Sequence, residues 1–193
     1  MTRILAIAGS LREHAFSKRV LLIAAEGARD AGADITFVDL RDYPMPIYNE
    51  DEHKTSGFDP NAARLQDLFG DSDGFLVSSP EYNGSIPGGL KNAIDWVSRK
   101  TDKYGLNEVF NNTWGALITS SPGSFGGLRC MSHLRGILSI MGVTILPNEI
   151  AVTFAGQKFE GDSGVMTDEK AKKQLESLGV QLVEAIRNTA NSQ

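Results

Sequence analysis

Short apolar runs alternate with amphipathic segments along most of the chain. The first run, Ile4–Ala8, is continuously apolar, as is typical of a strand that is covered on both faces. The segment from Phe16 to Ala31 repeats apolar residues three and four positions apart, which predicts a helix with Gly32 as its C-cap. Further strands are predicted at Ile35–Leu40, Gly74–Ser78, Trp114–Thr119 and Val143–Leu146, and further helices at Asn61–Phe69, from Gly89 to Val97, at Leu128–Met141 and at Glu169–Ile186.

Five short strands separated by helices indicate a parallel sheet with right-handed crossovers. This pattern predicts an α/β, flavodoxin-like three-layer sandwich, with a five-stranded parallel sheet in the order 2-1-3-4-5 and helices on both faces. We find neither an internal repeat nor a domain linker, so we expect a single domain over residues 1–193. Segments 41–58 and 99–112 are long for α/β connections, and we expect them near a binding pocket or at a subunit contact.

Composition narrows the class of protein. A formal net charge of −5 argues against general nucleic-acid binding, which normally needs a basic face. The single cysteine, Cys130, excludes an internal disulfide and fits a reducing compartment. No apolar run approaches the roughly 18 residues of a membrane span, and Met1–Ala8 is too short and too strand-like for a signal peptide. We therefore expect a cytoplasmic protein that does not enter a membrane.

The connection after the first strand has the side chains of a phosphate site. A parallel strand that leads into a helix presents unpaired backbone N–H groups at the carboxyl edge of the sheet. Ser10 and Ser17 add hydroxyls there, Arg12 adds a planar guanidinium that matches phosphate oxygens, and Lys18–Arg19 add positive charge. Taken alone, residues 9–12 could equally be a turn and a helix cap.

Other functional motifs are missing or weak. Because G-x-G-x-x-G is missing after the first strand, Asp39 is interpreted as a helix- or loop-facing carboxylate rather than a ribose ligand. The absence of G-x-x-x-x-G-K-[ST] argues against an NTPase. The three histidines lack metal-ligand spacing, so we expect no metal site. Cys130 is interpreted as structural, and residues 50–52 (Glu-Asp-Glu) as a solvated loop.

Two further connections suggest a site for a flat ring. They are residues 80–85, after the third strand, and residues 120–127, after the fourth strand, and both flank the point where the strand order reverses. The side chain of Asn83 can form hydrogen bonds with an amide-like ring edge, as both donor and acceptor. Tyr82 can cover part of a ring, or it can be a surface aromatic residue of the loop. The glycines permit close approach to a ligand or form turns, and Glu81 binds ligand, a backbone amide or a partner subunit. A flat ring plus one phosphate suggests flavin mononucleotide (FMN).

Three segments together resemble the NADPH-dependent FMN reductase family of flavodoxin-like proteins, which includes quinone, chromate and azo-dye reductases. They are GSLREHAFS (9–17), PEYNGSIPGGLKNAIDW (80–96) and SSPGSFGGLRCMSHLR (120–135). The middle segment is highly specific, and the resemblance runs from about Arg3 to about Met141.

The resemblance implies a set of FMN-binding residues. Positions that match family phosphate ligands are Ser10, Arg12 and Ser17; those that match the loop along the ring are Pro80, Glu81, Tyr82, Asn83 and Gly84; those that match the third side of the site are Ser121, Gly123 and Gly126. Many relatives have serine where this chain has Ala15, and often asparagine in place of Ser17. We therefore expect slightly weaker FMN binding.

The chemistry implied is a two-electron, ping-pong scheme in which NADPH or NADH gives a hydride to flavin N5 and a second small molecule then takes the electrons. The expected acceptors are quinones, free flavin, chromate or azo compounds, and no side chain is assigned as a catalytic residue. Arg12, Arg99 and Lys100 are candidates for contacting a 2′-phosphate. The resemblance also implies a homodimer or a homotetramer, with the helix that carries Ile94, Trp96 and Val97 either at the dimer contact or packed in the core.

Two other functions remain open from the sequence. A flavodoxin-type FMN electron carrier without its own NAD(P)H activity is the first alternative, although the Arg12 loop and the mild acidity favour a reductase. A flavin-independent regulatory or scaffolding domain on the same fold is the second.

Overall fold

The structure, a computed structural model, describes residues 1–161 and 164–190. Its centre is a parallel sheet in the order β2-β1-β3-β4-β5, with a sixth strand, β6, also paired with β4. The strands are β1 (Thr2–Ala8), β2 (Ala33–Asp39), β3 (Gly74–Pro80), β4 (Trp114–Ser120), β5 (Thr144–Ile145) and β6 (Ile150–Val152). The flavodoxin-like strand order predicted from the sequence is therefore confirmed.

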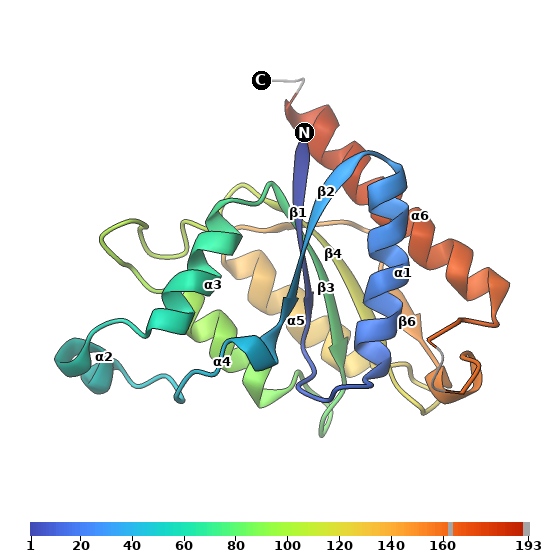
Figure 1. The fold of residues 1–193 in the computed structure, drawn as a ribbon, viewed down its shortest axis with the longest axis horizontal. Helices are drawn as coiled ribbons and strands as arrows, with labels where there is room; N and C mark the ends of the chain where they lie inside the picture. The colour runs from blue at the N-terminus through green and yellow to red at the C-terminus, as the bar shows by residue number, and fades with distance from the viewer. Residues whose placement is uncertain (162–163, 191–193) are drawn as a thin grey trace.

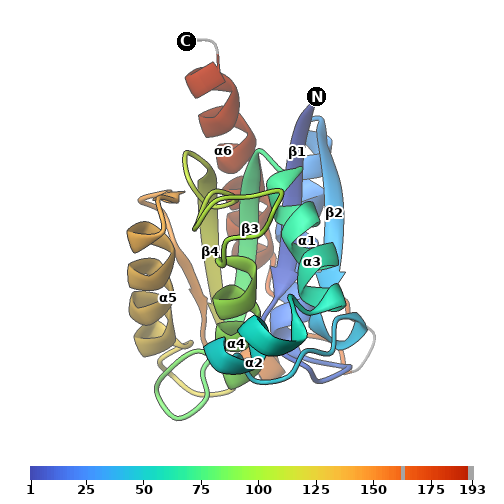
Figure 2. The ribbon, with the colours of Figure 1, turned by 90° about the vertical axis from the view of Figure 1, so that its left-hand side faces the viewer.

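Helices cover both faces of the sheet (Figures 1 and 2). Helices α1 and α6 pack on one face, and α3, α4 and α5 on the other. The helices are α1 (Phe16–Asp30), α2 (Glu50–Ser56), α3 (Pro60–Gly70), α4 (Gly88–Val97), α5 (Leu128–Ile140) and α6 (Glu169–Ala190), with short 3₁₀ turns η1 (Leu40–Asp42) and η2 (Ala155–Gln157). In Figure 2, α3 and α4 lie in front of the sheet and α6 passes behind it.

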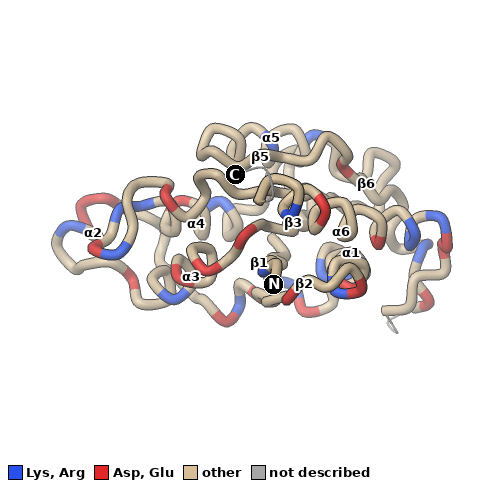
Figure 3. The backbone as a smooth tube through the Cα atoms, turned by 90° about the horizontal axis from the view of Figure 1, so that it is seen from above, with Lys and Arg blue, Asp and Glu red and all other residues tan. Residues whose placement is uncertain are grey.

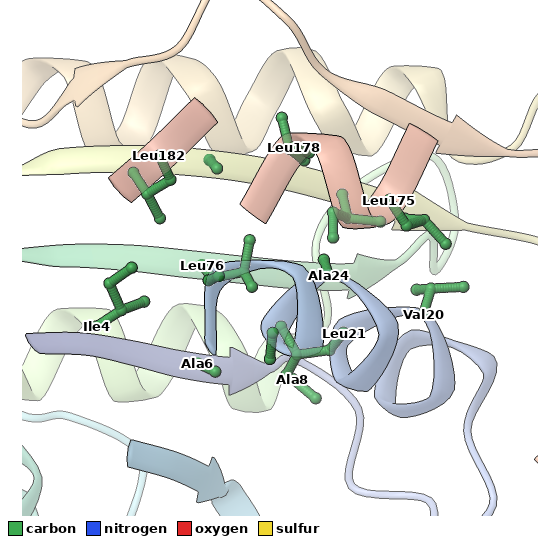
Figure 4. Close-up of a cluster of buried hydrophobic side chains, with 14 of the residues drawn as sticks. Ile4, Ala6, Ala8, Val20, Leu21, Ala24, Leu76, Leu175, Leu178 and Leu182 are labelled. Carbon is green, nitrogen blue, oxygen red and sulfur yellow. The ribbon is translucent and has the colours of Figure 1, made fainter. Parts of the chain in front are cut away.

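The core on the α1 side contains apolar residues of α1, among them Val20, Leu21 and Ala24, together with leucines of α6 (Figure 4). Leu175, Leu178 and Leu182 are fully buried, and burial of each such side chain contributes roughly 1.5–3 kcal/mol. The two helices approach closely where Gly179 meets α1: a Cβ atom at Gly179 would lie 2.0 Å from the carbonyl oxygen of Ala24. This contact holds α1 against α6, and the N-terminus of α1 lies at the carboxyl edge of the sheet.

The predicted fifth strand is in fact divided. β5 pairs with the first residues of β4, and β6 pairs with its last three residues. The intervening residues include Pro147, which has no backbone N–H to donate to a ladder. The sequence prediction of one strand at Val143–Leu146 was therefore wrong in its extent, and it missed β6.

The acidic segment after β2 is a helix rather than a solvated loop. Asn49 caps α2, because its side-chain oxygen accepts a hydrogen bond from the N–H of Asp51 at 3.0 Å. Three acidic residues in the first turn complement the helix dipole. The ring of His53 packs 5.7 Å from that of Trp96 on α4, which supplies the apolar contact that the α2 sequence lacks.

Helix α4 packs in the core. Ile94, Trp96 and Val97 are all buried within the chain, and the indole Nε1–H of Trp96 donates to the carbonyl of Pro46 at 2.8 Å. Of the two interpretations of these side chains, core packing is the one that the structure shows.

Charges of both signs are interspersed around the molecule (Figure 3). Within residues 1–161 and 164–190, no helix combines the length and the apolar composition that a membrane span needs.

Candidate functional site

A cavity of about 240 Å³ lies at the carboxyl ends of β1, β3 and β4. Three connections meet there: the first loop (residues 9–15), the second loop (81–87) and the third loop (121–127). The chain passes from β1 to β2 on one side of β1 and then crosses from β2 to β3 on the other side, so the strand order reverses at β1. Ligands bind at such a point in sheets of this kind. The cavity is lined by Ser10, Arg12, Ala15, Phe16, Ser17, Pro80, Glu81, Tyr82, Ser120, Ser121 and Pro122.

The N-terminus of α1 supplies hydrogen-bond donors at one end of the cavity. Ser17, in the first turn, is 1% exposed, and its hydroxyl has no hydrogen-bond partner among the described residues. Ala15 at the N-cap gives no side-chain bond, and the first turn has no acidic residue. A buried hydroxyl beside free helix N–H groups fits an anion such as a phosphate.

Ser10 and Arg12 complete this end of the cavity. Ser10 is buried, and its Oγ lies 3.4 Å from the Oη of Tyr82 and accepts a hydrogen bond from the Arg12 backbone N–H. Arg12 is exposed, and no ion pair is described for its guanidinium. It can therefore turn toward an anion in the cavity.

The neighbouring basic residues have other partners. Lys18 forms an ion pair with Asp39 at 2.7 Å, and Arg41 contacts the same carboxylate at 2.8 Å. Burial raises the pKa of Asp39, but hydrogen bonds from Arg41 and Lys18 outweigh it and lower the pKa to about 2. Arg19 lies over the Phe159 ring and donates to a backbone carbonyl. The charge expected at the site from Lys18–Arg19 is thus largely engaged elsewhere.

The second loop is a tight hairpin. Tyr82 and Ser85 exchange backbone hydrogen bonds of 2.9 and 3.0 Å across Asn83 and Gly84, whose φ angles are 51° and 79°. Positive φ at both central residues identifies an Asn-Gly turn of type I′. The turn leaves Tyr82 at the cavity and carries Asn83 and Gly84 beyond its lining.

Glu81 belongs to the cavity wall, but α5 binds its carboxylate. The carboxylate accepts hydrogen bonds from Arg129 at 2.9 and 2.5 Å and from the Cys130 backbone N–H at 3.2 Å. The alternative in which Glu81 binds a backbone amide is therefore what the structure shows. The thiol of Cys130 contacts Ser79 and the Pro80 carbonyl, and burial raises its pKa.

The third loop places Ser121 in the cavity and two glycines outside its lining. The Oγ of Ser121 accepts a hydrogen bond from the N–H of Gly123 at 3.1 Å, which shapes the turn. Gly126 has a φ of 60°, and a Cβ atom there would lie 3.0 Å from the carbonyl carbon of Ala151 on β6. Gly126 therefore forms a turn, which is one of the two roles considered from the sequence, and this turn packs closely against β6.

Ser120 and Phe16 line the cavity but were not among the predicted ligands. The hydroxyl of Ser120 is buried and has no partner among the described residues, like that of Ser17. Alternation along β4 puts Ser120 on the same face as Ala116 and Ile118, which pack toward α1. That pattern was available in the sequence and could have identified Ser120.

Two cations considered as 2′-phosphate ligands lie elsewhere. Arg99 follows the C-terminus of α4, where its guanidinium stacks over Tyr48 and donates to the Asp95 carbonyl. Lys100 lines a groove of about 580 Å³ beside α3, formed by residues of segments 41–58 and 99–112. Those long segments therefore border each other, and neither contributes a residue to the cavity lining.

The cavity of about 240 Å³ is smaller than other grooves of the molecule, but its lining fits a phosphate-bearing ligand better. A larger groove of about 670 Å³ lies at the edge of the sheet, between the β5–β6 turn and α6. Its lining includes acidic and basic side chains together, and it is remote from the point where strand order reverses. The smaller cavity combines that point with buried hydroxyls and a helix N-terminus, as a phosphate-bearing ligand requires.

Residues 2–157 match the sequence model of the family described as NADPH-dependent FMN reductase. An NAD(P)H:quinone oxidoreductase of Solanum tuberosum is 34% identical over 184 residues, covering 91% of this chain and 88% of the relative. An NAD(P)H-dependent FMN reductase of Pseudomonas aeruginosa is 33% identical over 175 residues, covering 90% and 89%.

A solved structure shows the same fold. The flavoenzyme NAD(P)H:(acceptor) oxidoreductase FerB of Paracoccus denitrificans superposes with a TM-score of 0.82 at 28% sequence identity, covering 97% of this chain and 98% of that one. The family match extends over most of the sequence. The chain belongs to the NADPH-dependent FMN reductase family, and the relatives it matches are named as NAD(P)H-dependent FMN and quinone reductases.

Proposed function

We propose that residues 1–193 act as a single FMN-binding domain of a ping-pong reductase that takes electrons from NADPH or NADH and passes them to quinones. Free flavin, chromate or azo compounds are further acceptors within this proposal. The observation that carries it is the buried hydroxyl of Ser17 at the N-terminus of α1, which lines the cavity and has no hydrogen-bond partner in the part of the chain that the structure describes. A hydroxyl in that state costs stability unless a ligand accepts its hydrogen bond.

In this proposal the enclosed part of the site holds the phosphate end of FMN. Ser10, Arg12, Ser17 and Ser120 donate to it, together with the first N–H groups of α1. A volume of about 240 Å³ is below the roughly 300–1,000 Å³ of typical ligand pockets, so the ring would lie outside it, along the second and third loops. When bound, FMN supplies two-electron chemistry between the nicotinamide and the acceptor.

The surroundings of the cavity suit flat, apolar molecules. Exposed apolar residues on the loops and helix ends around it are Leu11, Tyr82, Phe125, Leu128 and Phe154. Donor and acceptor would use this open face in turn, which is why a ping-pong order is proposed. Exposed apolar surface of this kind also favours association. We accordingly propose a homodimer, or a homotetramer of two dimers, which sedimentation equilibrium of the purified protein tests.

The first test is a visible absorption spectrum of the purified protein, followed by anaerobic addition of NADPH and then NADH. A yellow protein that bleaches within seconds supports the reductase and ranks the two donors. A yellow protein that does not bleach supports the electron-carrier alternative. A colourless protein that fails to take up added FMN contradicts the site itself.

Two further measurements test the details. Steady-state rates at several concentrations of NADPH and of a benzoquinone should give parallel double-reciprocal lines, whereas intersecting lines would contradict the ping-pong order.

Arg12→Ala should weaken FMN binding while leaving the fold intact, because the Arg12 side chain is exposed and forms no described ion pair. Unchanged FMN affinity in that variant would remove Arg12 from the phosphate site.

A further inference from the structure

Glu81 connects two of the three loops that form the cavity. It lies at the start of the second loop, and its side chain is 9% exposed because the carboxylate is turned toward α5. One carboxylate oxygen, Oε1, accepts from the Arg129 guanidinium, and the other, Oε2, accepts from the Cys130 backbone N–H. Each oxygen therefore has a separate partner in the first turn of α5.

Helix α5 has no local N-terminal cap. Its N-cap residue, Gly127, has a φ of 92° and forms no side-chain capping bond, and its first turn contains no acidic residue. Cys130 is the third residue of the helix, where an N-cap side chain normally accepts the backbone N–H. Glu81 performs this role from 49 positions away and places a negative charge at the positive end of the helix dipole.

Arg129 extends the connection into the third loop. Its guanidinium lies 5.4 Å from the centre of the Phe125 ring, so one side chain contacts both Glu81 and the third loop. The Tyr82–Ser85 hairpin begins at the residue after Glu81. Displacement of the carboxylate would therefore remove the links of the second loop to Arg129 and Cys130 in the first turn of α5. The contact between the Ser85 hydroxyl and His133, one turn further along α5, would remain at 2.9 Å.

We propose that Glu81 is a positioning residue, whose carboxylate fixes the spacing between the second and third loops and so determines how tightly FMN is held. This inference rests on the proposed function, because it requires the flavin ring to lie along those two loops. It departs from a direct ligand role for the Glu81 side chain, whose carboxylate oxygens are already bound within the protein.

The ionisation state of the Glu81 carboxylate agrees with this positioning role. Burial raises the pKa of Glu81, but the hydrogen bonds from Arg129 and Cys130 more than offset it and hold the pKa below its ordinary value. Glu81 consequently remains ionised at neutral pH, where both of its interactions with α5 are at full strength.

The experiment compares Glu81→Gln, Arg129→Met and the double variant with the wild-type protein. Gln keeps an acceptor for the Cys130 N–H but loses the ion pair, and Met keeps most of the length of the Arg129 side chain. We expect each single variant to raise the FMN dissociation constant about 10-fold and to change the visible circular dichroism of bound FMN. The double variant should bind no more weakly than the weaker single variant, because both changes break one interaction.

Asp73→Asn is the matched control. Asp73 also accepts a backbone N–H and a guanidinium from one distant residue, Arg3, but it lies at the amino end of β3, away from the cavity. Its loss should lower the melting temperature without changing FMN affinity or the flavin circular dichroism. A change in flavin properties with this variant would attribute the Glu81 effect to general destabilisation.

The outcomes separate the inference from the function on which it rests. If wild-type protein binds FMN and is bleached by NADPH, but Glu81→Gln retains wild-type affinity and circular dichroism, the positioning role is wrong. Additive losses in the double variant also contradict it. If the wild-type protein itself fails to bind FMN, the proposed function has failed.

Discussion

Ser17 and Ser78 are both buried serines whose hydroxyls have no partner among the described residues, but only Ser17 of the two lines the cavity. In the proposed site, Ser17→Ala would remove a donor to the FMN phosphate, and a hydrogen bond to a charged group contributes about 1.5–3 kcal/mol. We therefore expect the FMN dissociation constant to rise roughly 10- to 100-fold, as measured by fluorescence titration. Ligand-free stability should stay equal or increase, because the variant no longer buries an unpaired hydroxyl.

Ser78→Ala is the control for this prediction. It removes an equally buried hydroxyl from β3, outside the cavity lining, so FMN affinity should remain that of the wild type. Equal weakening by both substitutions would mean that packing around α1, rather than hydrogen bonding from Ser17, controls FMN affinity.

Asp39 gives a prediction about pH. Its folded-state pKa of about 2 lies below the ordinary value of 3.8, because hydrogen bonds from Arg41 and Lys18 outweigh the opposing effect of burial. A lowered carboxylate pKa contributes stability above the ordinary pKa, and that stability is lost as pH falls from about 4 to about 2. Asp39→Asn should lower the free energy of unfolding at pH 7 by up to about 2 kcal/mol, and the dependence on pH between 2 and 4 should become flatter. Urea denaturation across this range measures both effects, and an unchanged pH dependence would show that other carboxylates produce it.

Residue chemistry could be predicted from the sequence better than residue orientation. Ser10, Arg12 and Ser17 line the cavity because a strand-to-helix connection constrains them closely. Asn83 does not, since a type I′ turn carries it to the hairpin tip. The partners of the Glu81 carboxylate come from α5, 48 and 49 positions away. Such long-range hydrogen bonds leave no local sequence pattern.

At the level of elements, the contact between α1 and α6 positions the N-terminus that faces the cavity. Gly179→Ala would place a Cβ atom 2.0 Å from the Ala24 carbonyl oxygen and 2.7 Å from the Ala28 nitrogen, both backbone atoms. The two helices would have to move apart, so we expect a loss of roughly 3 kcal/mol or more in the free energy of unfolding. Chemical denaturation monitored by far-ultraviolet circular dichroism measures this loss.

Gly136→Ala on α5 is the same type of substitution, but it should raise the free energy of unfolding rather than lower it. Nothing lies within 4 Å of a Cβ atom at Gly136, so alanine should stabilise the helix by about 0.5–1 kcal/mol through its higher helix propensity. Similar effects of the two substitutions would contradict the close approach of α1 and α6.

Elements with a strong apolar pattern were predicted within a few residues, and those without one were missed. The strands β1, β3 and β4 are buried on both faces and form continuous apolar runs. Helix α2 has no buried residue, and its position depends on the contact of His53 with Trp96, a residue 43 positions later in the chain. The short β6 is defined by its pairing with β4, which no local pattern indicates.

At the scale of the whole molecule, the cavity exists because parallel strands bring their carboxyl ends to one edge. Ser10, Tyr82 and Ser121 are far apart in sequence but line the same cavity. This convergence could be predicted from strand order alone. How far the second and third loops are exposed depends on their conformations, which the strand order does not specify.

Convergence of the three loops on one ligand predicts that FMN stabilises the whole fold. A ligand that binds only the folded state at 100 times its dissociation constant adds about 2.7 kcal/mol to the free energy of unfolding. For a chain of this size, that should raise the melting temperature by roughly 5–10 °C in a thermal scan. Riboflavin at the same concentration carries the ring but no phosphate, so it cannot use Ser17 or the N-terminus of α1, and we expect a shift below about 2 °C. In the Ser17→Ala variant, the shifts in melting temperature caused by FMN and by riboflavin should be closer to each other than in the wild-type protein. Equal stabilisation by riboflavin and FMN in the wild-type protein would show that the ring loops, rather than the buried hydroxyls of the cavity, provide the binding energy.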